Sequence, residues 1–224
     1  MVAEDQSIES KVTRANGLRS RIARRAERAG IQLRPESIDA FATYLDILAV
    51  WNRKMNLTAL EDEDGAIDRL LLEPAMAVRF VPIDATGFLD VGSGAGSPAI
   101  PLKISLPWMR VWMVESKVRK SAFLREVVRQ LGLELAEVET ARFEALVARE
   151  DIRRAVDLVT IRAVRLDKAL WAALEAFVPP NASVFLFGGQ MRLDRRTLVP
   201  AFELVGDEHL LEANGSRLLR LRRL

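Results

Sequence analysis

The spacing of apolar residues changes about a third of the way along the chain. In the first part they recur every three or four positions, as along one face of an amphipathic helix. The clearest run is Ile38, Phe41, Leu45 and Leu48. Because no strand pattern interrupts this part, we expect a helical extension over residues 1–83. Its predicted helices cover 8–30, the residues from Pro35 onward, and about 63–80 with a break at Pro74.

From Gly87 onward, short apolar runs alternate with helical patterns. Such alternation indicates parallel strands with helices on both faces of one sheet. The expected class is therefore α/β, a doubly wound and mostly parallel sheet over residues 84–224. The predicted strands are 87–91, 110–114, 133–138, 156–161 and 183–187, the helices are 98–106, 117–131, 143–149 and 167–177, and a loop at 191–200 precedes a closing pair of strands at 201–205 and 218–221.

The first predicted strand runs into a glycine-rich loop, Gly92-Ser93-Gly94-Ala95-Gly96-Ser97-Pro98. Glycine lets the backbone turn tightly and leaves room for a ligand against the main chain. The amides that open the next helix carry partial positive charge. A loop of this kind at the first turn of a doubly wound sheet is typical of a nucleotide-like ligand, although an ordinary tight turn has the same glycine pattern.

Glu115 ends the second predicted strand, 19 residues after Gly96. A carboxylate at that place can accept both hydroxyl hydrogens of a ribose. It can equally serve the N-terminus of the helix that follows. The loop and the acid together predict a ribose-bearing cofactor, which is either NAD or S-adenosylmethionine.

The shortage of acid–base side chains favours S-adenosylmethionine over NAD. The chain has no cysteine, its single histidine is His209, and its single tyrosine, Tyr44, lies in the predicted extension. Hydride transfer needs a group that handles a proton, whereas a purine ring nitrogen has no proton to lose before it attacks a sulfonium methyl. Positioning and charge placement then suffice. The same shortage argues against a zinc site or a Ser-His-Asp triad, so no metal is expected.

Positive charge is concentrated locally, although the net charge is only +2. Such clusters attract polyanions, RNA above all, or form a solvated face. From the N-terminal cluster we expect Arg24 and Arg25 to contact phosphate. The polar N-terminus and the lack of a long apolar run predict no signal peptide and no membrane span, and the absent cysteines suit the cytoplasm. The clusters are Lys11, Arg14, Arg19, Arg21, Arg24, Arg25 and Arg28, then Arg192, Arg195 and Arg196, then Arg217, Arg220, Arg222 and Arg223.

Further segments accompany the loop and the acid in a fixed order. They are Trp51-Asn52-Arg53-Lys54-Met55-Asn56-Leu57-Thr58-Ala59, Leu89-Asp90-Val91 before the loop, Ile100-Pro101-Leu102 after it, Val114-Glu115-Ser116 with Arg119-Lys120 and Phe123-Leu124, Arg142-Phe143-Glu144, Asp157, and Arg162-Ala163. With this order and spacing, the chain resembles the bacterial 16S rRNA (guanine-N7) methyltransferase G family, also called glucose-inhibited division protein B.

The resemblance implies a Rossmann-like class I S-adenosylmethionine-dependent methyltransferase that modifies N7 of a guanine in small-subunit ribosomal RNA. The loop glycines and Ser97 would line the methionine part, Glu115 would hold the ribose, and Phe143 with Glu144 would border the adenine. The implied cofactor-binding residues are Gly92, Ser93, Gly94, Gly96, Ser97, Glu115, Phe143, Glu144 and Arg162.

Arg162 is also the implied catalytic residue, facing cofactor and target base. A guanidinium there could stack on guanine or fork to its O6 and N7 edge. Its structural alternative is an ion pair with Asp157 or Asp167.

Several family positions are altered in this chain. Leu70 stands where the family has a histidine, Pro74 replaces a serine, Ser97 replaces an aromatic residue, and Ala99 replaces a glycine. The fifth strand leads into glycines rather than into the usual Lys-Gly. Two other functions therefore stay open, a methyltransferase of the same fold with another acceptor and a catalytically weakened RNA-binding or ribosome-assembly factor. In each case we expect a monomer.

Overall fold

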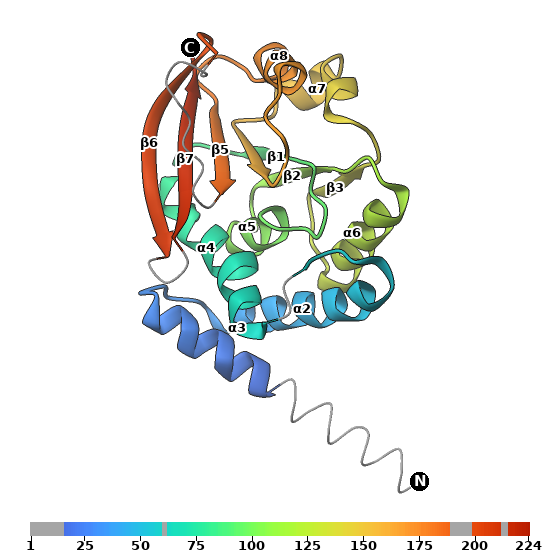
Figure 1. Ribbon diagram of the computed structural model, residues 1–224, viewed down its shortest axis with the longest axis vertical. Helices are drawn as coiled ribbons and strands as arrows, with labels where there is room; N and C mark the ends of the chain where they lie inside the picture. Colours follow the sequence, from blue (N-terminus) through green and yellow to red (C-terminus); the bar gives the residue numbers. More distant parts are fainter. Residues whose placement is uncertain (1–15, 60–61, 189–198, 212–214) are drawn as a thin grey trace, which may run out of the picture.

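A seven-stranded sheet forms the centre of the molecule in the computed structural model, which describes residues 16–59, 62–188, 199–211 and 215–224 (Figure 1). The strand order is β3-β2-β1-β4-β5-β7-β6. The first five strands in chain order pair in parallel, and β7 joins β5 and β6 antiparallel. The predicted α/β class is confirmed. The bounds are β1 (Gly87–Val91), β2 (Arg110–Val114), β3 (Ala136–Glu139), β4 (Leu158–Arg162), β5 (Ser183–Gly188), β6 (Phe202–Leu211) and β7 (Ser216–Arg223).

The two faces of the sheet carry separate hydrophobic clusters, because successive side chains of a strand point to opposite faces. Phe88 of β1 packs on the face that α5 and α6 cover. Leu89 and Val91 pack on the opposite face, against α8 and its neighbours. The layers are thus helix, sheet and helix, as the alternating pattern predicts. The helices in this part are α5 (Ala99–Ser105), α6 (Val118–Leu131), η3 (Phe143–Leu146), α7 (Glu150–Arg153) and α8 (Lys168–Phe177).

Every regular element among the described residues before β1 is a helix, as expected. A helix over residues 16–28 comes first, and residues 8–15 of the predicted helix lie outside the described residues. The break expected at Pro74 is a change of helix type, because a π-helical turn precedes the α-helical turn that Pro74 opens. The remaining elements are α2 (Pro35–Met55), α3 (Glu63–Ala66), η1 (Ile67–Leu72), α4 (Glu73–Ala77) and η2 (Val78–Phe80).

The helical extension packs directly on the sheet domain. Ile22, Phe41 and Leu71 belong to the same buried cluster as Phe88 of β1. Trp51 of α2 also meets Phe123 of α6 edge-on, with ring centroids 5.9 Å apart. Since one hydrophobic cluster joins both parts, the extension holds a fixed position beside the carboxyl ends of the strands.

Several elements differ in their bounds from the sequence-based expectation, and β6 and α7 differ most. The closing strand β6 runs to Leu211, well beyond the predicted 201–205, because its outer part alternates exposed and half-buried residues at a sheet edge. The short helix α7 was not predicted, and its four residues are too few to show a helical period. Most of the predicted loop at 191–200 lies outside the described residues. No helix in the described ranges is long and apolar enough to cross a membrane.

Candidate functional site

The glycine loop leaves the carboxyl end of β1 and needs glycine at two places. Gly92 has φ +70°, and a Cβ there would lie 2.7 Å from a methyl carbon of Val164. Gly96 has φ +92°, and its Cβ would meet Ile100 at 2.9 Å. Side chains are strained in this backbone region and would also collide with their neighbours. The backbone of the loop is therefore held in a conformation that excludes side chains at Gly92 and Gly96, at the carboxyl end of β1.

Glu115 faces this loop from the end of β2. The side chain is 7% exposed. One carboxylate oxygen accepts the amide hydrogen of Gly94 at 3.0 Å, and the other accepts that of Lys117 at 2.7 Å. Of the two roles considered from the sequence, the structure shows the one at the N-terminus of α6, and it adds a contact with the loop. The ribose role stays a prediction.

Asp90 is a second acid at this place, and it was not among the predicted site residues. It lies within β1, 1% exposed, and accepts a hydrogen bond from the Thr160 hydroxyl at 2.6 Å. Its other carboxylate oxygen has no partner among the described residues. Burial raises the pKa of Asp90 to about 6, against the opposing hydrogen bond from Thr160. A single acid in a wholly buried, otherwise apolar strand was the available signal.

Arg162, at the end of β4, is tied to the helical extension. Its side chain is 8% exposed and pairs with Glu73 at 2.8 Å. It also donates to the Arg69 carbonyl, and its guanidinium lies 4.9 Å from the ring centroid of Phe187. Burial lowers the pKa of Arg162, while Glu73 opposes that shift. Arg162 thus forms a buried ion pair, as the alternative considered from the sequence expects, but its partner is Glu73.

The two acids expected to pair with Arg162 are engaged elsewhere. Asp157 accepts the backbone amides of Thr86 at 2.7 Å and Gly87 at 3.1 Å. Asp167 caps α8 by accepting the amide of Leu170 at 3.0 Å. Expecting an ion pair of Arg162 with either of them was therefore wrong.

Two further contacts fasten the extension to the glycine loop. The Tyr44 hydroxyl donates to the Ala95 carbonyl at 2.6 Å, and the Ser97 hydroxyl donates to the Leu70 carbonyl at 2.9 Å. Burial raises the pKa of Tyr44 well above its ordinary value, so the phenol keeps its proton and remains a donor. Tyr44 thus reaches the loop although it is far from it in the sequence.

Phe143 and Glu144 lie at the start of η3, and their side chains differ in exposure. Phe143 is buried and packs edge-on against Phe177, with ring centroids 5.2 Å apart. Glu144 is exposed. The Phe143 ring is therefore part of the hydrophobic core, while the Glu144 carboxylate is open to solvent.

The Trp51–Ala59 segment closes the end of α2. The Asn52 side chain donates to the Thr58 carbonyl at 3.0 Å and accepts the Thr58 amide at 2.9 Å. Asn56 caps the helix with φ 48°, a left-handed conformation that asparagine tolerates. These contacts give the segment a structural role next to the site.

The predicted basic clusters are largely paired within the chain. Arg25, expected to contact phosphate, instead binds Asp68 at 2.6 Å and Asp64 at 2.7 Å. These acids lie about forty residues away in the sequence, and a phosphate would have to compete with them for Arg25. The phosphate contact stays a prediction. Arg24 is exposed and has no side-chain partner among the described residues. The cluster at 192–196 lies outside the described residues. Other paired cations are Arg19 with Asp39, Arg21 with Glu63, Arg217 with Asp207, Arg220 with Glu208 and Arg222 with Glu203.

Within the described part of the chain, no group of three or more His, Cys, Asp or Glu side chains is placed to hold a metal ion. The arrangement instead offers two buried carboxylates, a glycine loop that is exposed at Gly92, and a buried guanidinium. Such a set can bind and orient a polar ligand without proton transfer.

The raised pKa of Asp90 predicts a pH-dependent stability difference. The carboxyl titrates near pH 4 when unfolded and near pH 6 when folded, so the native state binds the proton more tightly and stability falls as pH rises through this window. The Asp90→Asn side chain does not ionise, so it avoids the cost of a buried charge at neutral pH. It can still accept a hydrogen bond from the Thr160 hydroxyl. We expect the variant's stability relative to wild type to increase by about 2 kcal/mol from pH 4.5 to pH 7.5 in urea denaturation. A pH-independent difference would contradict the assignment.

Two solved structures with a similar fold are named methyltransferases. One is a SAM-dependent methyltransferase from Aquifex aeolicus, with TM-score 0.51 and 12% identity, covering 75% of this chain and 97% of that one. Another is the mitomycin 7-O-methyltransferase MmcR, with TM-score 0.53 and 15% identity, covering 84% and 72%. At these identities the likeness establishes the fold alone.

Sequence relatives are much more similar, and three of them carry the name ribosomal RNA small subunit methyltransferase G. The protein of Acetivibrio thermocellus is 32% identical over 88% of this chain and 82% of its own length. The protein of Xanthomonas campestris pv. campestris is 35% identical over 82% of this chain and 86% of its own length. That of Chloroflexus aggregans is 38% identical over 84% of this chain and 76% of its own length. The family model GidB, described as rRNA small subunit methyltransferase G, matches residues 37–201. The chain therefore belongs to the GidB family of rRNA small subunit methyltransferases.

Proposed function

We propose that this protein transfers a methyl group from S-adenosylmethionine to N7 of a guanine in small-subunit ribosomal RNA. The observation that carries the proposal is the buried Glu115 carboxylate facing the glycine loop, in a chain of this family. The fold places both at the carboxyl edge of a doubly wound sheet, where nucleotide-like ligands bind.

The residues at this edge fit such a cofactor. Gly92 leaves bare backbone where a side chain would collide, Glu115 offers acceptors for a ribose, and Asp90 holds an unpartnered buried oxygen next to the loop. We assign Glu115 to the ribose, and Glu144, above the packed ring of Phe143, to the adenine end. When bound, the cofactor supplies an electrophilic methyl group on a sulfonium. The loop residues assigned to its methionine part are Gly92, Ser93, Gly94, Gly96 and Ser97.

The acceptor needs little chemistry from the protein. A guanine N7 has a free lone pair and no proton to remove, so the site needs no general base. Arg162, our candidate catalytic residue, is braced by Glu73 and the Arg69 carbonyl. It holds positive charge at the β4 end and fixes the neighbouring η1 turn, which bounds the space for the base.

We assign the RNA contact to cations that lack a partner inside the protein. Lys117 and Arg119 lie two and four residues after Glu115, are exposed, and have no side-chain partner in the described ranges. The arginines of β7, by contrast, face acids on β6. An unpaired cation next to the cofactor loop can bind phosphate without first losing an ion pair.

We further propose that the protein acts as a cytoplasmic monomer. In this proposal residues 1–83 form the helical extension and residues 84–224 the methyltransferase domain. The extension's role is to brace the loop and to help dock the RNA.

Cofactor binding by Glu115 can be tested by calorimetry. Loss of charge-assisted hydrogen bonds to the ribose should weaken S-adenosylmethionine binding by about 10- to 100-fold in Glu115→Gln. Glu175→Gln removes an exposed carboxylate on α8 and should bind like wild type. No binding of S-adenosylmethionine by wild type, or tight binding of NAD, would reject the assignment.

The RNA surface can be tested through the salt dependence of binding. Lys117→Ala with Arg119→Ala should lower affinity for small-subunit rRNA and reduce the log–log salt slope by about 1.5. Arg217→Ala with Arg222→Ala changes the net charge equally and serves as the control. Equal effects of the two pairs would show that only net charge matters.

The substitution of Leu70 for the family histidine favours one alternative, a different methyl acceptor. Incubation with labelled cofactor and undermethylated ribosomal RNA separates the possibilities. We expect label in the RNA. Label in a small molecule or protein alone would support the other acceptor, and RNA binding without any transfer would support an assembly factor.

A further inference from the structure

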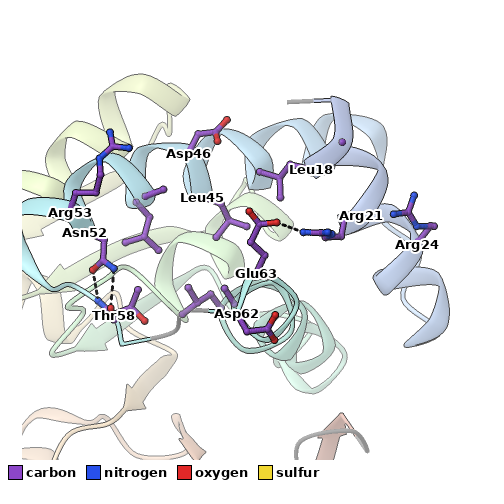
Figure 2. A pocket seen from close by; sticks show the side chains of 15 residues that line it. Leu18, Arg21, Arg24, Leu45, Asp46, Asn52, Arg53, Thr58, Asp62 and Glu63 are labelled. Carbon is purple, nitrogen blue, oxygen red and sulfur yellow. Dashed lines mark hydrogen bonds and ion pairs between the residues drawn. The ribbon is translucent and has the colours of Figure 1, made fainter. Parts of the chain in front are cut away.

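A cleft of about 600 Å³ lies on the helical extension, between the helix over residues 16–28, α2 and the α3–η1 segment (Figure 2). Its volume falls in the range of small-molecule sites, roughly 300–1,000 Å³. Leu18, Leu45, Leu48 and Leu70 give it an apolar lining. None of the cofactor-binding residues assigned above lines it, so it is a separate site.

Most polar groups around the cleft are already satisfied within the protein. Arg21 is paired with Glu63, as the dashed line in Figure 2 shows. Asp62 caps α3 by accepting the amides of Asp64 at 3.2 Å and Gly65 at 2.8 Å. Asn52 is held by the Thr58 backbone. These groups are not available to a ligand without breaking an internal contact.

Two guanidinium groups at the cleft remain free among the described residues. Arg24 and Arg53 line it, are exposed and have no internal partner. They lie toward opposite ends of the cleft, on different helices (Figure 2). Asp46, also without a partner in the described ranges, lies on α2 between them and reduces the net positive charge. Binding here would therefore depend on the apolar lining as well as on charge.

We propose that this cleft binds one unpaired nucleotide of the RNA substrate, next to the methylated one. The base would lie on the leucines, and Arg24 and Arg53, toward opposite ends of the cleft, would hold phosphates of the strand on either side of that nucleotide. Proteins that recognise single-stranded RNA commonly accept unstacked bases in this way, and guanidinium is the side chain best suited to phosphate. The inference rests on the proposed function, since it assumes an RNA substrate.

The position of Leu70 connects the cleft with the methyl-transfer site. Its side chain lines the cleft, and its carbonyl accepts the Ser97 hydroxyl of the glycine loop at 2.9 Å. A nucleotide in the cleft is thus separated from the loop by one turn of η1. Docking there would place the neighbouring RNA residue at the carboxyl edge of the sheet.

The leucines alone would also suit an apolar side chain of a partner protein. The two free guanidinium groups favour a phosphodiester, because an apolar peptide would leave both without a partner. Binding of a protein is therefore treated as an outcome that the test can reveal.

Filling the cleft provides the test. Ala49 lines it and is exposed, so Ala49→Phe should occupy the space without disturbing the core. Val50→Phe adds a ring at the next residue, which is 51% exposed and is not a lining residue. With undermethylated small-subunit rRNA as the probe, we expect Ala49→Phe to raise the Kd at least about tenfold, with calorimetric S-adenosylmethionine affinity unchanged. Val50→Phe should match wild type.

A second variant keeps the result interpretable if Ala49→Phe folds poorly. Arg24→Ala with Arg53→Ala alters no buried packing and should weaken RNA binding more than Arg217→Ala with Arg222→Ala. Wild-type RNA affinity in Ala49→Phe, or equal effects of the two arginine pairs, would overturn the proposal. If Ala49→Phe leaves RNA binding unchanged, and a partner protein binds wild type but not this variant, the cleft belongs to that protein. Failure of wild type to bind S-adenosylmethionine would instead reject the proposed function.

Discussion

The buried ion pair between Arg162 and Glu73 holds the two parts of the molecule in register. One partner ends a central strand, and the other begins α4 of the helical extension. Removing one member of a buried pair typically costs about 3–5 kcal/mol, because the other charge is left without compensation. With Tyr44 bound to Ala95 and Ser97 bound to Leu70, the pair fixes the extension against the glycine loop. The geometry of the candidate cofactor site therefore depends on helices that precede it in the chain.

The same contacts set the electrostatics of the site. Asp90 and Glu115 are buried at one edge of the sheet. Burial raises the pKa of Asp90, and the Arg162 charge is among the weaker effects that oppose this rise. Tyr44 stays protonated and only donates. A site built from fixed dipoles and paired charges suits a reaction in which a methyl group moves between two atoms and no proton must be removed first.

The sequence predicts the framework well because its signals are local. β1 and β2 match their predicted bounds, since buried parallel strands are continuous apolar runs. The start of α2 at Pro35 and the end of α6 before Gly132 follow from residue types with fixed roles at helix ends.

The missed features depend on residues far apart in the chain. Tyr44 reaches a loop 51 residues away, and Glu73 meets Arg162 across 89 residues. The pairing of Arg25 with Asp68 likewise spans 43 residues. No periodicity reports such contacts, because they arise only when the extension packs on the sheet. Asp90 is different, since an acid within an otherwise apolar strand is visible in the sequence itself.

The most direct test of the account is a crystal structure with S-adenosylhomocysteine, the demethylated product of the cofactor. The account predicts that both ribose hydroxyls lie within hydrogen-bond distance of the Glu115 carboxylate, with the amino-acid part along the loop that begins at Gly92. A complex in which the ligand lies away from Glu115 and the glycine loop would contradict it.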